Sequence, residues 1–178
     1  ELPTQENKQT PYPHDSIHKT LFGSPKLVQE FLLGFAPQDV VKHLDFTTLE
    51  QYPNNFISED LKELRSDMVW RVKLKNGEWI YCFLLLEFQS SPDKHMPLRI
   101  LFYTVLLWRH LADNDPQTRQ HGLPPVFPIV IYSGKDKWSP ACDINGLLDK
   151  DIPPELMEYQ ISQKFFLLEE ARLSDEQV

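Results

Sequence analysis

The carboxylates best placed for chemistry are Asp67 and Glu87, which stand in two neighbouring segments that we predict to be strands. Asp67 lies near the start of residues 64–75, and Glu87 lies near the end of residues 79–89, two positions before Gln89. A carboxylate at the end of an apolar strand is desolvated, which raises its pKa unless a cation offsets the cost. Glu87 therefore needs a partner. Two carboxylates on one face would suit Mg²⁺, which prefers oxygen ligands.

The turn between the two segments decides whether these carboxylates share a face. A two-residue loop, Asn76-Gly77, would pair Asp67 with Leu86 and leave the carboxylates on opposite faces of the sheet. A three-residue loop, Lys75–Gly77, with its glycine in the left-handed conformation, would pair Asp67 with Leu85 and bring them to one face. Both loops suit Asn-Gly, so the turn residues leave the choice open. A shared metal site requires the three-residue loop, or a bulge that restores the same parity.

Alternation of side chains gives each segment two different faces. In the first segment one face is apolar and the other carries arginines and lysines around a single acid. The apolar face holds Met68, Trp70 and Val72. The second segment has apolar residues on both faces, which predicts an interior strand covered on both sides.

Helical spacing of apolar residues marks three further segments. Residues 15–22 and 25–35 are predicted to be two short helices, and a longer helix should run from the loop at residues 90–93 to about Ala112. Pro97 is tolerated in the first turn of that helix. Its apolar residues cover much of the circumference, so we expect it to be largely buried; they are Leu98, Leu101, Phe102, Val105, Leu106 and Trp108.

The rest of the chain gives shorter signals, which complete an α/β domain with a mixed central sheet flanked by helices. A brief strand is expected at residues 46–49, an interior strand at 126–132 and a last strand within 159–168, with loops at 113–125 and 135–154. Residues 1–13 are expected to form a flexible tail, residues 14–168 one domain, and residues 169–178 the start of a truncated C-terminal region.

Composition narrows the class of protein. The 178 residues are 41% hydrophobic and 25% charged, which is typical of a globular chain. A formal net charge of -8 counts against a generic nucleic-acid coat protein, but not against an enzyme that meets phosphate through a metal and a local basic strip. No apolar run is long enough to span a membrane. Cys82 and Cys142 lack CxxC partners and are expected to be free thiols, as in a cytoplasmic protein.

Two histidines near the start suggest a different metal. His14 and His18 have the i, i+4 spacing that holds Zn²⁺ on one helix face, as in a zinc protease. Asp15 stands where such proteases have their catalytic glutamate, and no third ligand is evident. A capped helix start with exposed imidazoles is the structural alternative.

Asp67 followed by Glu87-x-Gln89 resembles the signature of the PD-(D/E)xK nuclease superfamily. The resemblance is closer still to the Rpn family of recombination-promoting nucleases, also labelled YhgA-like putative transposases. Four stretches carry it, in the family's order: HDSIHKTLF, LRSDMVWRV, LLLEFQSSPDKHMPLRILFY and PVFPIVIYSG. The resemblance implies a restriction-endonuclease-like core that cleaves DNA with a bound divalent cation: Mg²⁺, or another such as Mn²⁺ or Ca²⁺.

The resemblance also implies roles for particular residues. Asp67 and Glu87 would be metal ligands, together with the backbone carbonyl of Phe88. Gln89 takes the position usually held by lysine; a neutral amide cannot act as a general base, but it can orient the attacking water. Ser133 stands where relatives often carry histidine.

Three further residues are candidates for the same site. Arg99 and Tyr103 lie four apart on one face of the predicted helix and would contact phosphate or support the site. The alternative for Arg99 is a buried ion pair with Glu87 or another acid. Asp15 opens a matching stretch and is placed near the active site by the resemblance. A homodimer is expected by analogy with restriction enzymes, and the rival function is a catalytically inactive nuclease fold that binds DNA or protein.

Overall fold

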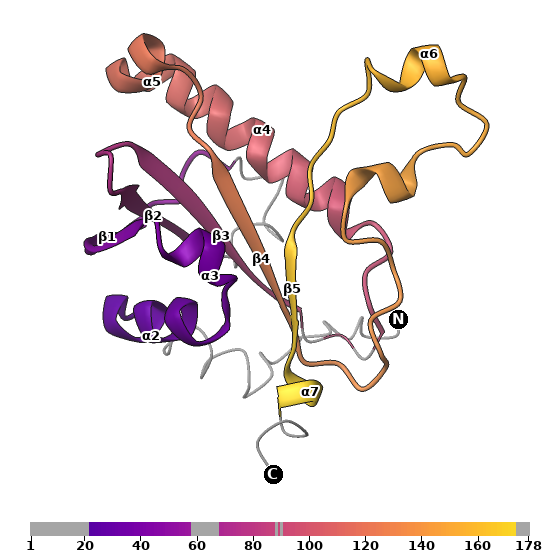
Figure 1. Cartoon of the computed structure of the whole chain (residues 1–178), viewed down its shortest axis with the longest axis horizontal. Coiled ribbons are helices and arrows are strands. Elements are labelled where there is room, and N and C mark those ends of the chain that lie inside the picture. Colours follow the sequence, from indigo (N-terminus) through magenta and orange to yellow (C-terminus); the bar gives the residue numbers. More distant parts are fainter. Residues whose placement is uncertain (1–21, 58–67, 88, 90, 174–178) are drawn as a thin grey trace, which may run out of the picture.

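The computed structural model describes residues 22–57, 68–87, 89 and 91–173. The strands are β1 (Leu44–Tyr52), β2 (Met68–Leu74), β3 (Trp79–Glu87), β4 (Val126–Tyr132) and β5 (Phe166–Glu169). The helices are α2 (Pro25–Phe35), α3 (Gln38–Val41), α4 (Met96–Asn114), α5 (Pro116–His121), the 3-10 helix η2 (Ile144–Leu147), α6 (Pro154–Met157) and α7 (Glu170–Leu173). The strands form one sheet in the order β1-β2-β3-β4-β5 (Figure 1). β1, β2 and β3 are antiparallel neighbours, whereas β4 and β5 run parallel to β3, so the predicted mixed sheet is confirmed.

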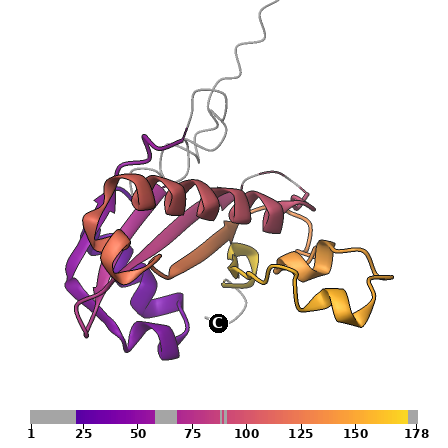
Figure 2. The ribbon, with the colours of Figure 1, turned by 90° about the horizontal axis from the view of Figure 1, so that it is seen from above.

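Helices cover both faces of this sheet, with α4 on one face and α2 and α3 on the other (Figure 2). Each face has its own apolar cluster. Trp70 and Cys82 pack in the cluster beneath α2, whereas Phe83 and Val130 pack in the cluster beneath α4. Cys82 and Phe83 are consecutive and only 0% and 1% exposed. The prediction that β3 is covered on both faces is therefore confirmed.

The β2–β3 hairpin closes with the three-residue loop Lys75–Gly77. The Leu74 N–H donates to the Glu78 carbonyl at 2.7 Å, and the Gly77 N–H donates to the Leu74 carbonyl at 2.8 Å. Gly77 has φ of 91°, the left-handed conformation that favours glycine. The ladder runs in register from Lys73 opposite Trp79 to Met68 opposite Leu84. A metal site shared by the two strands requires this three-residue loop and this register of pairing.

Before the hairpin, α2 and β1 are of the predicted type and only β1 differs in length, whereas α3 was not predicted. Helix α2 follows the predicted span, with Pro25 in its first turn; residues 15–21 of the other predicted helix lie outside the described residues. Strand β1 is longer than the expected residues 46–49, and Tyr52, expected in a loop, ends the strand. The pairing of β1 with β2 shifts register between Asp45 and Glu50. The Thr48 hydroxyl accepts the Lys73 N–H at 2.8 Å there, a local substitute for a ladder bond that propensity alone does not predict.

Helix α4 begins and ends close to its predicted limits, but the expectation that it is largely buried is wrong. Leu98, Phe102 and Val105 are 52%, 45% and 49% exposed. They lie at i, i+4 and i+7, which is one stripe of a helix. The stripe faces away from the sheet because α4 packs on the sheet with its opposite side only. That side is formed by Met96, Pro97, Ile100, Tyr103, Thr104, Leu107 and Leu111.

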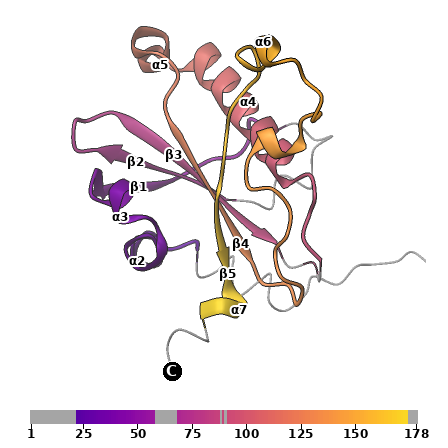
Figure 3. The same cartoon turned by 45° about the vertical axis from the view of Figure 1, so that its right-hand side comes forward.

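Helices α4 and α5 connect β3 to its parallel neighbour β4, and a longer excursion containing η2 and α6 connects β4 to β5 (Figure 3). Helix α5 lies within the stretch predicted to be a polar loop. Asp115 caps it by accepting the N–H groups of Gln117 and Thr118. β5 is shorter than the predicted last strand, and it ends at Glu169, which was expected to lie beyond the domain. None of the helices in the described part of the chain is both long and apolar enough to cross a bilayer.

Candidate active site

Glu87 is the last residue of β3 and projects from the α4 face of the sheet. The face follows from alternation, since Tyr81, Phe83 and Leu85 belong to the cluster beneath α4. Glu87 is only 5% exposed, an unusual depth for a carboxylate. Strand β4 lies parallel to β3 and ends level with it, with Tyr132 opposite Glu87. The loops that follow the two strands therefore begin side by side at the carboxyl edge of the sheet, next to Glu87.

Two groups among the described residues that follow Glu87 in the chain contact its carboxylate. The backbone N–H of Gln89 donates to Glu87 Oε1 at 3.1 Å. Arg99, in the first turn of α4, places Nη1 3.6 Å from Glu87 Oε2, and its side chain is 24% exposed. The ion pair that the sequence analysis gave as the alternative role of Arg99 is therefore present. At this separation and exposure, the guanidinium offsets the charge of the carboxylate and still reaches solvent.

The end of β4 and the two residues that follow it support the same segment from the other side, and of these only Ser133 was noted in the sequence. Tyr132 pairs with Glu87 in the ladder, and the Ser133 N–H donates to the Glu87 carbonyl at 3.1 Å. Gly134 is buried, and a Cβ added there would lie closer than 3.0 Å to both the Tyr132 phenol and the Gln89 carbonyl. Gly134 thus permits a close approach between the two loops that leave the sheet edge. A glycine directly after an apolar strand was the available sequence signal.

The carboxyl edge carries a row of polar groups across three strands. Glu87, Tyr132 and Glu169 are consecutive ladder partners on β3, β4 and β5. Glu169 accepts the Trp138 N–H at 3.0 Å and lies 3.4 Å from Arg172, so it holds the loop after β4 against β5. Burial raises the pKa of the Tyr132 hydroxyl, and neighbouring carboxylates, including Glu87 and Glu169, raise it further. Tyr132 consequently remains a neutral hydroxyl in the middle of this row at physiological pH.

The other predicted site residues differ in burial, and several of them lie outside the described residues. Gln89 is exposed just beyond the end of β3. Tyr103 lies one turn after Arg99 but is 1% exposed, with its ring 5.7 Å from the ring of Phe83. Asp15, Asp67 and Phe88 lie outside the described residues, as do His14 and His18.

Within the described ranges, no three His, Cys, Asp or Glu side chains form a cluster that could hold a metal ion. Glu87 is the described member of the proposed ligand set, and its carboxylate is the oxygen ligand that Mg²⁺ prefers.

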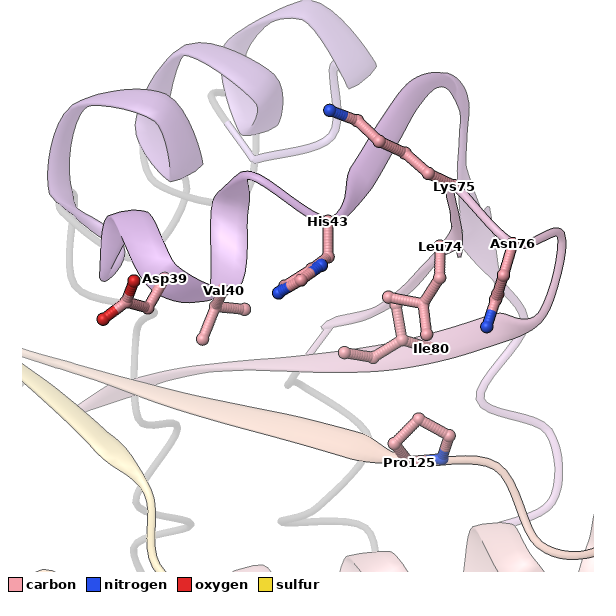
Figure 4. Close-up of a pocket in the computed structure, with 8 residues that line it drawn as sticks. All are labelled: Asp39, Val40, His43, Leu74, Lys75, Asn76, Ile80 and Pro125. Atoms are coloured by element: carbon pink, nitrogen blue, oxygen red, sulfur yellow. The ribbon is translucent and has the colours of Figure 1, made fainter.

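A separate hollow of about 500 Å³ lies at the other end of the sheet, between α3 and the hairpin loop (Figure 4). Its walls are mainly apolar, with Val40, Leu74 and Ile80 beneath a rim that includes His43 and Lys75. At about 3.3 Å per residue along β3, Ile80 stands roughly 23 Å from Glu87. The hollow is therefore distinct from the carboxyl edge.

Comparison with known proteins identifies the family. The family model described as "Putative transposase, YhgA-like" matches residues 12–178 of the chain. The chain belongs to the YhgA-like putative transposase family. No solved structure matches the chain significantly.

Relatives of this YhgA-like chain have recombination-promoting nuclease names. It is 29% identical to the "Inactive recombination-promoting nuclease-like protein RpnE" of Escherichia coli (strain K12), over 95% of this chain and 54% of the relative. Recombination-promoting nuclease RpnA of the same strain is 29% identical, over 96% of this chain and 56% of the relative. Recombination-promoting nuclease RpnD of Escherichia coli O157:H7 is 30% identical, over 72% and 48%. The chain spans about half the length of these relatives.

Proposed function

We propose that this chain is the nuclease domain of a divalent-metal-dependent DNA endonuclease, with a restriction-endonuclease-like core formed by the sheet and α4. One observation carries the proposal: Glu87 is buried at the carboxyl edge of a hairpin whose register has the required parity. If the ladder continues by one pair beyond Met68, Asp67 comes opposite Leu85 on the face of Glu87. The names of relatives such as RpnA support DNA as the substrate class.

The proposed ligands are the carboxylates of Asp67 and Glu87 and the backbone carbonyl of Phe88. This is an all-oxygen set, which fits Mg²⁺ or a similar divalent cation. A bound cation supplies a Lewis acid for the phosphoryl oxygen and an acidified water for the attack.

The chain's own residues would position the reactants. The Gln89 N–H already orients Glu87, and the Gln89 side-chain amide would hold the attacking water by hydrogen bonds. Arg99 would balance the charge of Glu87 before the cation binds and contact the scissile phosphate afterwards, because a guanidinium suits phosphate oxygens. Asp15 and Tyr103 remain proposed supporting residues. The cytoplasmic location and the homodimer also remain proposals.

A second candidate is a catalytically inactive nuclease fold that binds DNA or a protein. Gln89 favours it, because a neutral amide lacks both the charge and the basicity of lysine. The word "Inactive" in the name of the similar RpnE points the same way. Both candidates share the fold and the location of the site; they differ in turnover and, where the ligand is a protein, also in what is bound.

Plasmid nicking separates the two candidates. Supercoiled plasmid is incubated with Mg²⁺, Mn²⁺ or Ca²⁺ and with wild type, Asp67→Ala, Glu87→Ala or Gln89→Lys. Glu30→Ala is the control, because Glu30 is exposed on α2, on the opposite face of the sheet. We expect wild type and the Glu30→Ala control to nick the plasmid when a divalent metal is present. Asp67→Ala and Glu87→Ala should not nick it.

Three other outcomes are informative. Nicking that survives Asp67→Ala and Glu87→Ala would refute the proposed ligands. DNA binding without nicking in wild type, with nicking gained in Gln89→Lys, would identify an inactive fold that lost its lysine. Neither binding nor nicking by any form would reject DNA as the substrate of this chain.

A further inference from the structure

A hollow of about 490 Å³, here named the edge groove, lies among the loops that leave the carboxyl ends of β3 and β4. Ser91 and Lys94 line it from the loop between β3 and α4. Asp136, Lys137 and Ser139 line it from the loop after β4. Prolines and other apolar side chains form the rest of its surface.

The edge groove is attached to the candidate active site through both of its walls. Ser91 follows Gln89 by two positions in the chain. On the other wall, the Asp136 backbone hydrogen-bonds the Tyr132 hydroxyl, and Tyr132 is the ladder partner of Glu87. The two loops are also brought together by the close approach at Gly134. A polymer that reaches Glu87 along this edge would therefore pass over the groove.

The polar residues of the groove are those that hold phosphate. Lys94 and Lys137 are exposed, and neither forms an ion pair with a carboxylate in the described part of the chain. The described arginines near the sheet are engaged differently: Arg71 pairs with Glu50 and Arg99 pairs with Glu87. Two lysines that pair with no carboxylate of the described residues lie beside two serine hydroxyls, and these are groups that contact phosphate and sugar in protein–DNA complexes.

We propose that the edge groove binds the phosphodiester backbone of DNA next to the phosphate that is cleaved at Glu87. Lys94 and Lys137 each neutralise one phosphate, and Ser91 and Ser139 donate hydrogen bonds to phosphate oxygens. This inference rests on the proposed function and adds to it the track of the substrate. It also explains how a chain of net charge -8 meets DNA: the cations are local, and Asp136 is the single carboxylate among the described residues that line the groove.

Salt dependence of binding tests the groove directly. The affinity for a fluorescent DNA duplex is measured by anisotropy over a range of salt concentrations, in EDTA so that nothing is cleaved. The double variant Lys94→Gln/Lys137→Gln should reduce the slope of log affinity against log salt by about 1.8, since each lost phosphate contact contributes about 0.9. The control Lys26→Gln/Lys42→Gln makes the same charge change on α2 and at the end of α3, on the face of the sheet opposite α4, and its slope should equal that of wild type.

A variant of opposite sign strengthens the test. Asp136→Asn removes the carboxylate found among the described lining residues and should tighten DNA binding, whereas a groove that meets no DNA would show no change. Single-turnover cleavage with Mg²⁺ then separates binding from chemistry: the double variant should need more protein for half-maximal rate and should reach the wild-type rate at saturation.

The outcomes distinguish the groove from the proposed function. If wild type binds and nicks DNA while the groove variant has the same salt dependence of binding as the control variant, the edge groove does not bind DNA and the endonuclease proposal stands. If wild type neither binds nor nicks DNA, both are wrong. If binding is weakened equally in the groove variant and in the control, net charge and not the groove determines affinity, which also overturns the inference.

Discussion

Gly134→Ala should damage the candidate active site through a single methyl group. Gly134 lies where the loop after β4 passes the segment after β3, and its missing side chain leaves room for the Tyr132 phenol and the Gln89 carbonyl. Because the Gln89 N–H also orients the Glu87 carboxylate, a shift of this backbone changes the position of the proposed metal ligand.

The size of the effect follows from what the methyl group meets. The added Cβ would lie closer than 3.0 Å to three atoms, two in the Tyr132 phenol and one in the backbone of Gln89. A backbone carbonyl cannot move aside by a change of rotamer, so the loops must separate. Overpacking of this kind costs about 1–3 kcal/mol in the free energy of unfolding.

The assay pairs stability with activity. Urea denaturation should show the loss for Gly134→Ala, and plasmid nicking should fall by more than the small unfolded fraction explains. The matched control is Gly34→Ala in α2, where an added Cβ meets nothing within 4 Å. Since alanine is the better helix former by about 1 kcal/mol, that variant should be slightly more stable and equally active.

A Gly134→Ala protein with wild-type stability and nicking would refute the close approach at this edge. A protein that is destabilised but nicks normally once folded would show that the approach stabilises the fold without positioning Glu87. The second result would leave the ladder contact through Ser133 as the main support of that strand end.

Three further predictions concern single ionisable groups. Arg99→Gln should lower the free energy of unfolding by about 3 kcal/mol, because it leaves the Glu87 charge buried, and Mg²⁺ should restore part of that loss in thermal melts. Burial favours a raised pKa for Asp115, but hydrogen bonds from Thr118 and Gln117 outweigh it and lower the pKa. Asp115→Ala should therefore cost about 1 kcal/mol at pH 7, and this difference should vanish in urea titrations as the pH falls through the lowered folded-state pKa. Burial raises the pKa of the Cys82 thiol to about 12 and also raises that of Cys142, so Ellman's reagent at pH 8 should label Cys142 slowly and Cys82 only after unfolding.

Each of these predictions has a result that contradicts it. Equal stabilisation of wild type and Arg99→Gln by Mg²⁺ would mean that the cation does not replace the Arg99 charge at Glu87, and no stabilisation of either protein would mean that it does not bind there. A constant difference between Asp115→Ala and wild type from pH 7 to pH 3 would mean that the carboxylate charge contributes nothing to the cap of α5. Labelling of native Cys142→Ser at the wild-type rate would show that Cys82 is reached without unfolding.

Much of the fold could be predicted because strong periodicity coincided with clear stop signals. Helix α2 has its apolar residues at helical spacing and a proline in its first turn. Strand β3 is apolar on both faces, and only an interior strand buries both. The apolar run of β4 is short and bounded by turn residues, which identifies it equally well. In these elements local propensity and tertiary burial favour the same structure.

The wrong predictions concern segments whose burial depends on tertiary contacts, which no local sequence pattern specifies. The stripe of Leu98, Phe102 and Val105 is as apolar as the packed side of α4, so composition could not tell which side meets the sheet. Helix α5 was missed because its six residues contain no apolar periodicity. Its signal was the cap instead, an aspartate followed directly by proline.

The candidate site could be predicted in its residue types but not in its support. Glu87 and Arg99 were chosen from the sequence, and the structure places them 3.6 Å apart. Tyr132 and Gly134 were not, because their importance comes from a contact between two loops that are more than 40 residues apart in the sequence. A glycine needed for a close approach has the same local signature as one in any surface turn.

The hairpin turn is where the sequence leaves the geometry of the candidate site undetermined. Asn-Gly is compatible with loops of two or three residues, and a one-residue difference moves every side chain of a strand to the other face. Burial on both faces of β3 does not distinguish the two loops, because the apolar residues of β3 would be buried with either register. What fixes the register is the left-handed Gly77 together with the bond from Leu74 to Glu78. The proposed chemistry at the carboxyl edge thus requires a turn at the opposite end of the hairpin, since that turn decides which side chains of β2 share a face with Glu87.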